Sequence, residues 1–190
     1  MAGAPLVAIS ARLWLVRHGA TDWSDKGRLN GWADVFLNER GRLQAERLAA
    51  WLAGKAFAGV WSSDLSRSTE TARLAASGAA TDERLRELDF GELEGRTWDE
   101  CPPEVRQALA AFDDFEAPGG EAVTQLRRRV HEFAMALGDG DHLVFTHGGV
   151  IRLLLREAGR GASVTPGEMV SLSAAEVDQQ TLGRSDWRSL

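Results

Sequence analysis

Two histidines of this sequence each follow a short apolar run and precede a glycine. His18 comes after the run 13–16 together with Arg17, and His147 comes after the run 143–146. A glycine beside each histidine allows a ligand to approach the backbone amides closely. Since a neutral imidazole is a nucleophile and a proton carrier near pH 7, both positions are candidates for attack on an electrophile.

Two arginines are candidates for the same site. Arg17 directly precedes His18, and Arg67 lies about one helical turn after the polar segment 62–64, which follows a third apolar run at 60–61. A guanidinium group pairs with phosphate oxygens, and a helix that starts after this segment adds free N–H donors. Nearby cations disfavour a charged histidine, so we expect a neutral imidazole suited to attack on phosphorus, with the arginines neutralising the transferring phosphoryl group.

The elements that must position these residues alternate between strands and helices. The short apolar runs are typical of buried strands. Apolar residues at helical spacing follow each of the three runs, and a further set lies at 126–137. The expected helices cover about 39–52, about 65–76, 126–137 and 150–158. Asn38 is the expected N-cap of the first helix, and residues 62–64 are suited to cap the second. This alternation predicts an α/β fold, a three-layer sandwich with a mostly parallel central sheet flanked by helices. Because the carboxyl ends of parallel strands share an edge, the histidines and arginines should converge there.

The 190 residues fit one domain, 1–190, with a lid and a polar tail. The segment from about 97 to 120 interrupts the alternation with Pro102-Pro103 and a run of acidic residues, and we expect it to form a lid over the sheet. A last strand is expected at 169–173 and a frayed tail at about 183–190.

Composition excludes several classes of protein. The net charge of −6 and the pI near 5.3 argue against a nucleic-acid partner. The uncharged run 1–11 is far shorter than the ~18 apolar residues of a membrane helix and lacks the features of a secretory signal, so a cytoplasmic protein without a membrane partner is expected. The single cysteine, Cys101, excludes an internal disulfide.

Six blocks of sequence between residues 15 and 152 occur in an order shared by a known family. They are LVRHGATDWS at 15–24, GRLNGWADVFLNERGRLQA at 27–45, SSDLSRSTETA at 62–72, LRELDFGELEG at 85–95, PGGE at 118–121 and VFTHGGVIR at 144–152. Together they resemble the histidine phosphatases of the phosphoglycerate-mutase-like superfamily, in particular compact phosphatases such as α-ribazole phosphatase. The RHG motif at 17–19 alone would be a weak signal, whereas six ordered blocks are a strong one.

The resemblance implies a role for each matching residue. His18 matches the histidine that attacks phosphate and becomes phosphohistidine, and Arg17 and Arg67 match the arginines that hold the phosphoryl oxygens. His147 matches a second histidine that donates to those oxygens. Glu87 matches the acid that protonates the leaving alcohol and then activates water.

Other matching positions are less decisive. Gly148, Ser24 and Asn30 are candidate substrate-binding residues, although the family usually has asparagine at the position of Ser24 and often glutamine at that of Asn30. Asp89 is the alternative to Glu87 as the acid.

The remaining histidines and basic residues have structural interpretations. We expect His131 and His142 to be structural or solvated and the run 127–129 to form a solvated helix face. The segment 139–150 lacks the glutamate that a calcium loop needs, so no metal is expected, and no cofactor either.

The resemblance leaves two activities open. The predicted lid carries six acidic residues against Arg106, which makes it a poor clamp for a second phosphate. This favours a phosphatase that acts on a small phosphorylated metabolite, such as α-ribazole phosphate or a sugar phosphate, over a phosphoglycerate mutase. A non-catalytic sensor of phosphorylated ligands is the alternative of another class, and the chain is expected to be a monomer or a homodimer.

Overall fold

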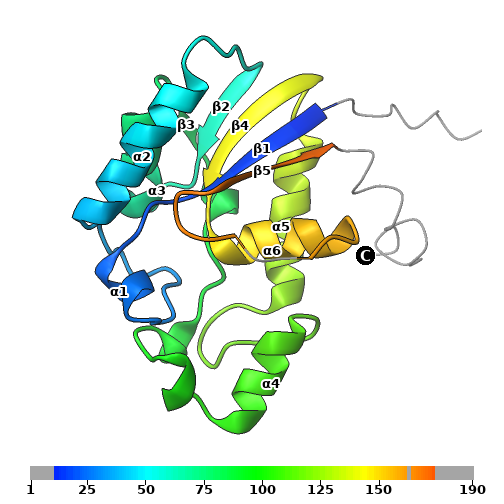
Figure 1. The fold of residues 1–190 in the computed structure, drawn as a ribbon. Helices are drawn as coiled ribbons and strands as arrows, with labels where there is room; N and C mark the ends of the chain where they lie inside the picture. The colour runs from blue at the N-terminus through cyan, green and yellow to red at the C-terminus, as the bar shows by residue number, and fades with distance from the viewer. Residues whose placement is uncertain (1–10, 162–163, 174–190) are drawn as a thin grey trace, which may run out of the picture.

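Five strands form one sheet in the computed structural model, which describes residues 11–161 and 164–173 (Figure 1). The strand order is β3-β2-β4-β1-β5, and all neighbours pair in parallel except β5, which runs antiparallel to β1. The strands are β1 (Ala11–Arg17), β2 (Gly59–Ser62), β3 (Ala80–Thr81), β4 (Gly140–Thr146) and β5 (Met169–Ser173). The predicted α/β fold with a mostly parallel sheet is confirmed. The sequence did not indicate β3, because two exposed residues carry no hydrophobic pattern.

Helices cover both faces of the sheet, as Figure 1 shows. α2 and α3 pack against one face, and α5 and α6 against the other. The helices are α1 (Asp22–Asp25), α2 (Glu39–Leu52), α3 (Ser66–Ala75), α4 (Pro103–Ala111), α5 (Val123–Met135) and α6 (Gly148–Glu157), with single 3₁₀ turns at Glu83–Leu85, Gly91–Leu93 and Trp98–Glu100. None of the helices in residues 11–161 and 164–173 combines the length and the apolar character that a membrane span requires.

The alternation of side chains along β1 divides the core in two. Leu15 packs in the cluster that contains Ile151 of α6, whereas its neighbour Val16 packs in the cluster that contains Leu52 of α2 and Ala72 of α3. Successive side chains of a strand point to opposite faces, so a continuous apolar run is what a sheet with two covered faces requires.

The register of the two central strands places both candidate histidines at one edge. Arg17, the last residue of β1, pairs with Thr146, the last residue of β4. His18 and His147 therefore leave the sheet side by side, and the His18 amide donates to the Thr146 carbonyl at 2.9 Å.

The N-termini of α2 and α3 are capped differently. Asn38 caps α2 as predicted, since its side chain accepts from the Gly41 amide at 2.9 Å. The predicted capping of the next helix by residues 62–64 is wrong, because the N-cap of α3 is Leu65. Asp34 serves instead: its carboxylate accepts from the Ser66 amide at 2.9 Å and from the Ser66 hydroxyl at 2.6 Å.

The segment 97–120 contains the turn Trp98–Glu100 and α4. Cys101, Leu109 and Phe112 of this segment are buried in the same cluster as α5 and α6, so it is anchored to the core. One domain with a lid stays a prediction, and the predicted tail at 183–190 lies outside the described residues.

Candidate active site

A cleft of about 370 Å³ lies beside the carboxyl ends of β1 and β4. Part of its lining is polar and comes from Arg17, His18, Asn30, Glu87 and the start of α6. The apolar lining consists of Leu29, Phe90, Trp98, Leu109, Phe112 and Val164. The structure thus brings strand ends and the segment 97–120 together around one cavity.

His18 is buried with one ring nitrogen committed. Its Nδ1 lies 2.8 Å from the carbonyl oxygen of Gly19. A carbonyl only accepts, so the proton sits on Nδ1 and the lone pair on Nε2. Burial is the main cause that holds the pKa of His18 well below 6.5, and Arg67 and Arg17 lower it further against the opposing effect of the Gly19 hydrogen bond. The ring is therefore neutral near pH 7, as predicted, although burial outweighs the cations as the cause.

His147 is fully buried at the N-cap of α6. Neither of its ring nitrogens has a hydrogen-bond partner among the described residues. Burial, followed by Arg67 and then His18, holds its pKa well below 6.5. A neutral ring carries one N–H, which can donate a hydrogen bond to an oxygen of a bound ligand.

Of the two predicted arginines, Arg17 lines the cleft, whereas Arg67 does not line it but is close enough to lower the pKa of His18 and of His147. Both have part of their donors occupied. Arg17 donates from one terminal nitrogen to the Val164 carbonyl at 2.7 Å. The guanidinium of the fully buried Arg67 donates to the carbonyls of Asn30, Gly31 and Ala33 at 2.6–3.2 Å. Burial lowers the pKa of Arg67 to about 10, so the group remains charged at neutral pH.

Buried polar atoms without partners gather at this site. Within the described residues they are the Nε atoms of Arg17 and Arg67, both amide atoms of Asn30 and both ring nitrogens of His147. Each buried polar group without a partner lowers stability by about 1–3 kcal/mol, so a cluster of such groups indicates a binding site for a ligand. Because most of these atoms are N–H groups and two belong to cations, the fitting ligand is an anion with several acceptor oxygens.

Glu87 lines the same cleft and is held by two backbone amides. Its Oε1 accepts from the Leu88 amide and its Oε2 from the Gly149 amide, both at 2.9 Å. Its backbone carbonyl accepts from Trp32 Nε1 at 2.8 Å. The structure therefore brings Glu87 to the cleft together with His18 and Arg17, whereas Asp89, the alternative acid, does not line the cleft.

The weaker candidates occupy different surroundings. Ser24 lines the cleft, but its hydroxyl already donates to the Thr21 carbonyl and accepts from the Thr21 amide, each at 2.9 Å. Donation to a substrate oxygen would have to replace the bond to the Thr21 carbonyl, because a hydroxyl has a single O–H. Gly148 lies against Arg17: a Cβ at this position would be 3.3 Å from the Arg17 Cζ. Substrate binding by Ser24, Asn30 and Gly148 stays a prediction.

Two arginines in the cleft lining were not identified from the sequence. Arg28 donates to the Gly95 carbonyl, and Arg152 donates to the Ala110 carbonyl at 2.6 Å while its guanidinium lies 4.6 Å from the Phe112 ring centre. Both lie outside the segment 97–120, so the acidic character of that segment does not describe the charge of the cleft.

The expectation of a solvated run at 127–129 is wrong for Arg129. Its side chain is only 15% exposed and forms an ion pair with Glu121 at 2.7 Å. Its position three residues after Leu126 and four before Phe133 places it beside the buried stripe of α5, a signal that the sequence contained.

The other two histidines are structural as expected: His131 pairs with Glu157 at 2.7 Å, and the buried His142 is bonded to the Gly138 carbonyl at 2.9 Å. Across residues 11–161 and 164–173, no group of three or more His, Cys, Asp or Glu side chains is arranged to hold a metal ion.

Comparisons with known proteins agree on one family. The family model described as histidine phosphatase superfamily (branch 1) matches residues 13–189. "Phosphoglycerate mutase-like protein 4" of Arabidopsis thaliana is 37% identical over 163 residues, which cover 78% of this chain and 71% of the plant protein. "Probable phosphoglycerate mutase GpmB" of Yersinia pestis is 35% identical over 156 residues, or 76% of this chain and 73% of that protein.

Solved structures share the fold. A phosphoglycerate mutase from Thermus thermophilus is 42% identical with a TM-score of 0.80, covering 85% of this chain and 92% of its own. An Escherichia coli protein described as "a putative alpha-ribazole-5'-P phosphatase" is 30% identical with a TM-score of 0.70, covering 86% of this chain and 90% of its own.

Proposed function

Because the chain belongs to the histidine phosphatase superfamily (branch 1), we propose that it hydrolyses a small phosphate monoester through a phosphohistidine on His18. The observation that carries the proposal is the cluster of unpartnered buried polar atoms on Arg17, Asn30, Arg67 and His147. A phosphoryl group offers these donors three oxygens, and His18 Nε2 is free to reach its phosphorus.

The residues of the cleft divide the reaction into two steps. In the first, the His18 Nε2 lone pair forms a bond to phosphorus, the ester P–O bond breaks, and protonated Glu87 gives its proton to the leaving alkoxide. In the second, the Glu87 carboxylate takes a proton from water, the water oxygen bonds to phosphorus, and the P–N bond breaks. Inorganic phosphate leaves, and both His18 and Glu87 return to their starting protonation.

The arginines and His147 stabilise the charge that shifts during each step. The guanidinium groups of Arg17 and Arg67 neutralise the equatorial phosphoryl oxygens, and His147 donates an N–H to one of them. The buried surroundings strengthen these interactions because few water molecules screen them.

The apolar lining supports an ester whose alcohol carries an aromatic or aliphatic group. Its six residues include Phe90, Phe112 and Trp98, whose aromatic side chains offer mainly apolar contact. An α-ribazole phosphate, with its aromatic base, suits this lining better than a bare sugar phosphate does.

A phosphoglycerate mutase is the second candidate, favoured by Arg28 and Arg152 in the cleft lining and by the names of several relatives. Two additional guanidinium groups can bind the carboxylate or the second phosphate of such ligands. Conversion of 3-phosphoglycerate to 2-phosphoglycerate, primed with a bisphosphate, distinguishes this activity from hydrolysis.

The deciding experiment is release of inorganic phosphate from a panel of monoesters by wild type and His18→Ala. The panel contains an aryl phosphate, 3-phosphoglycerate, sugar phosphates and α-ribazole phosphate. We expect wild type to release inorganic phosphate even in excess EDTA and to form an acid-labile phosphoprotein when it is mixed briefly with an ester. The His18→Ala variant should do neither. Binding of these esters without turnover by the wild type would instead indicate a sensor, and loss of activity in EDTA would contradict the metal-free mechanism.

A further inference from the structure

The backbone that carries Glu87 has no regular secondary structure. Residues 86–90 follow the 3₁₀ turn Glu83–Leu85 and belong to neither a strand nor a helix. A general acid must be held to within a fraction of an ångström of its working position. Side chains from other elements therefore have to fix this segment.

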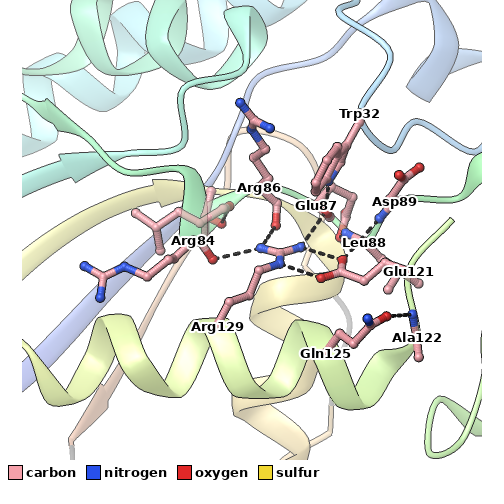
Figure 2. A network of polar contacts seen from close by, with 12 residues as sticks. Trp32, Arg84, Arg86, Glu87, Leu88, Asp89, Glu121, Ala122, Gln125 and Arg129 are labelled. Carbon is pink, nitrogen blue, oxygen red and sulfur yellow. Dashed lines mark hydrogen bonds and ion pairs between the residues drawn. The ribbon is translucent and has the colours of Figure 1, made fainter.

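Arg129 of α5 supplies part of that support, as Figure 2 shows. One terminal nitrogen donates to the carbonyls of Arg84 and Arg86 at 2.8 and 2.6 Å, and the other donates to the Glu87 carbonyl at 2.8 Å. The remaining two N–H groups bind Glu121: Nε at 2.7 Å and a terminal nitrogen at 2.8 Å. All five guanidinium N–H groups thus have an acceptor.

Glu121 bonds the same segment further along the chain. Its amide donates to the Asp89 carbonyl at 3.0 Å, and its Oε2 accepts from the Asp89 amide at 3.4 Å. The pair Arg129–Glu121 consequently contacts the backbone both at Glu87 and two residues beyond it.

The chemistry of the pair requires both partners. The Arg129 and Glu121 side chains are 15% and 11% exposed, so removal of either charge leaves the other poorly hydrated. Lysine cannot replace Arg129, since three donors on one nitrogen cannot reach acceptors arranged around a planar fork. Arg128, the preceding residue, is exposed and provides a matched comparison.

We propose that Arg129 is a positioning residue for catalysis: with Glu121 it fixes the backbone at Glu87 so that this carboxyl can protonate the leaving oxygen. The proposal rests on the proposed function, in which Glu87 is the general acid. It separates Arg129 from a purely structural role in the first step, which kcat/KM reports, because within that step only proton transfer to the leaving group depends on the acid.

The test compares Arg129→Lys and Glu121→Gln with the control Arg128→Lys on two esters. An alkyl phosphate needs a proton on its leaving oxygen, whereas p-nitrophenyl phosphate releases an acidic phenol that leaves without one. We expect Arg129→Lys and Glu121→Gln to lower kcat/KM for the alkyl ester by about 10-fold or more, since general acid catalysis contributes about 10²–10⁴-fold. The activation of water by Glu87 belongs to the second step and does not enter kcat/KM, which covers only the steps up to loss of the alcohol. The kcat/KM for p-nitrophenyl phosphate should therefore fall far less, and Arg128→Lys should match wild type on both esters.

Amide hydrogen exchange of residues 84–90 gives a readout that does not need turnover. Faster exchange in Arg129→Lys but not in Arg128→Lys, at similar thermal stability, supports the proposal. Unchanged exchange, or an equal loss of kcat/KM on both esters, would overturn it. If wild type hydrolyses neither ester, the proposed function fails, and the exchange result alone then decides whether Arg129 fixes the Glu87 segment.

Discussion

The imidazole rings of His18 and His147 lie 5.1 Å apart, centroid to centroid, and are tilted by 57°. Two rings this close and beside two guanidinium groups cannot both be charged at modest cost. Burial first and Arg67 second hold the pKa of each ring well below 6.5. The pair therefore offers a bound anion one free nucleophilic nitrogen, on His18, and at least one hydrogen-bond donor, on His147.

The lowered pKa values predict a loss of stability in mild acid. Below pH 6.5 the unfolded chain protonates both histidines while the folded chain does not, so the free energy of unfolding falls as pH falls. We expect Tm to drop from pH 7 to pH 5, and to drop less in His147→Gln, which removes one of the two groups. His131 and His142 remain in both proteins, so an identical pH dependence of Tm in wild type and variant would contradict the assignment.

Arg67 should contribute strongly to the rate. Arg67→Ala removes a buried cation with a free Nε at the site, and loss of one such positioned group costs about 10²–10³-fold. The expected loss is in kcat/KM for every ester, measured as phosphate release. Arg73→Ala, an exposed arginine of the same helix, is the control. A variant of Arg67 that stays folded and retains wild-type kcat/KM would exclude Arg67 from the phosphoryl site.

Trp98 should select the alcohol part of the substrate. It lines the cleft with 42% of its surface exposed, so Trp98→Ala removes ring contact with little effect on the core. Contact with an aromatic group is worth about 1.5 kcal/mol or more, which corresponds to about a 10-fold higher KM for 3-phenylpropyl phosphate. Propyl phosphate, with a similar leaving group, should be unaffected. Trp51→Ala, 45% exposed on α2, is the matched control, and equal effects of Trp98→Ala on both esters would contradict a role in selectivity.

Local patterns predicted the parts of the fold that depend on neighbouring residues. The apolar runs at 13–16 and 143–146, combined with the parallel arrangement, placed His18 and His147 at one edge, and Asn38 marked the start of α2. The cap of α3 was not predictable in this way because Asp34 lies 32 residues before Ser66. Arg127, Arg128 and Arg129 are the same residue type, and only their positions relative to Leu126 and Phe133 distinguish Arg129, whose side chain is largely covered.

The start of α6 leaves no room for a side chain beside the acid. A Cβ at Gly149 would lie 2.1 Å from Glu87 Oε1, so Gly149→Ala must displace the carboxyl that the Gly149 amide now binds. We expect a fall in kcat/KM for alkyl phosphates that is much smaller for p-nitrophenyl phosphate, because in the first step only the former need the proton. Gly138→Ala, whose Cβ would meet nothing within 4 Å, controls for the change of residue type. Gly149 and Arg129 contact Glu87 from different elements. If Gly149→Ala and Arg129→Lys show the same dependence on the leaving group, the proton donor is Glu87. If neither variant shows this dependence, the proton donor is another group.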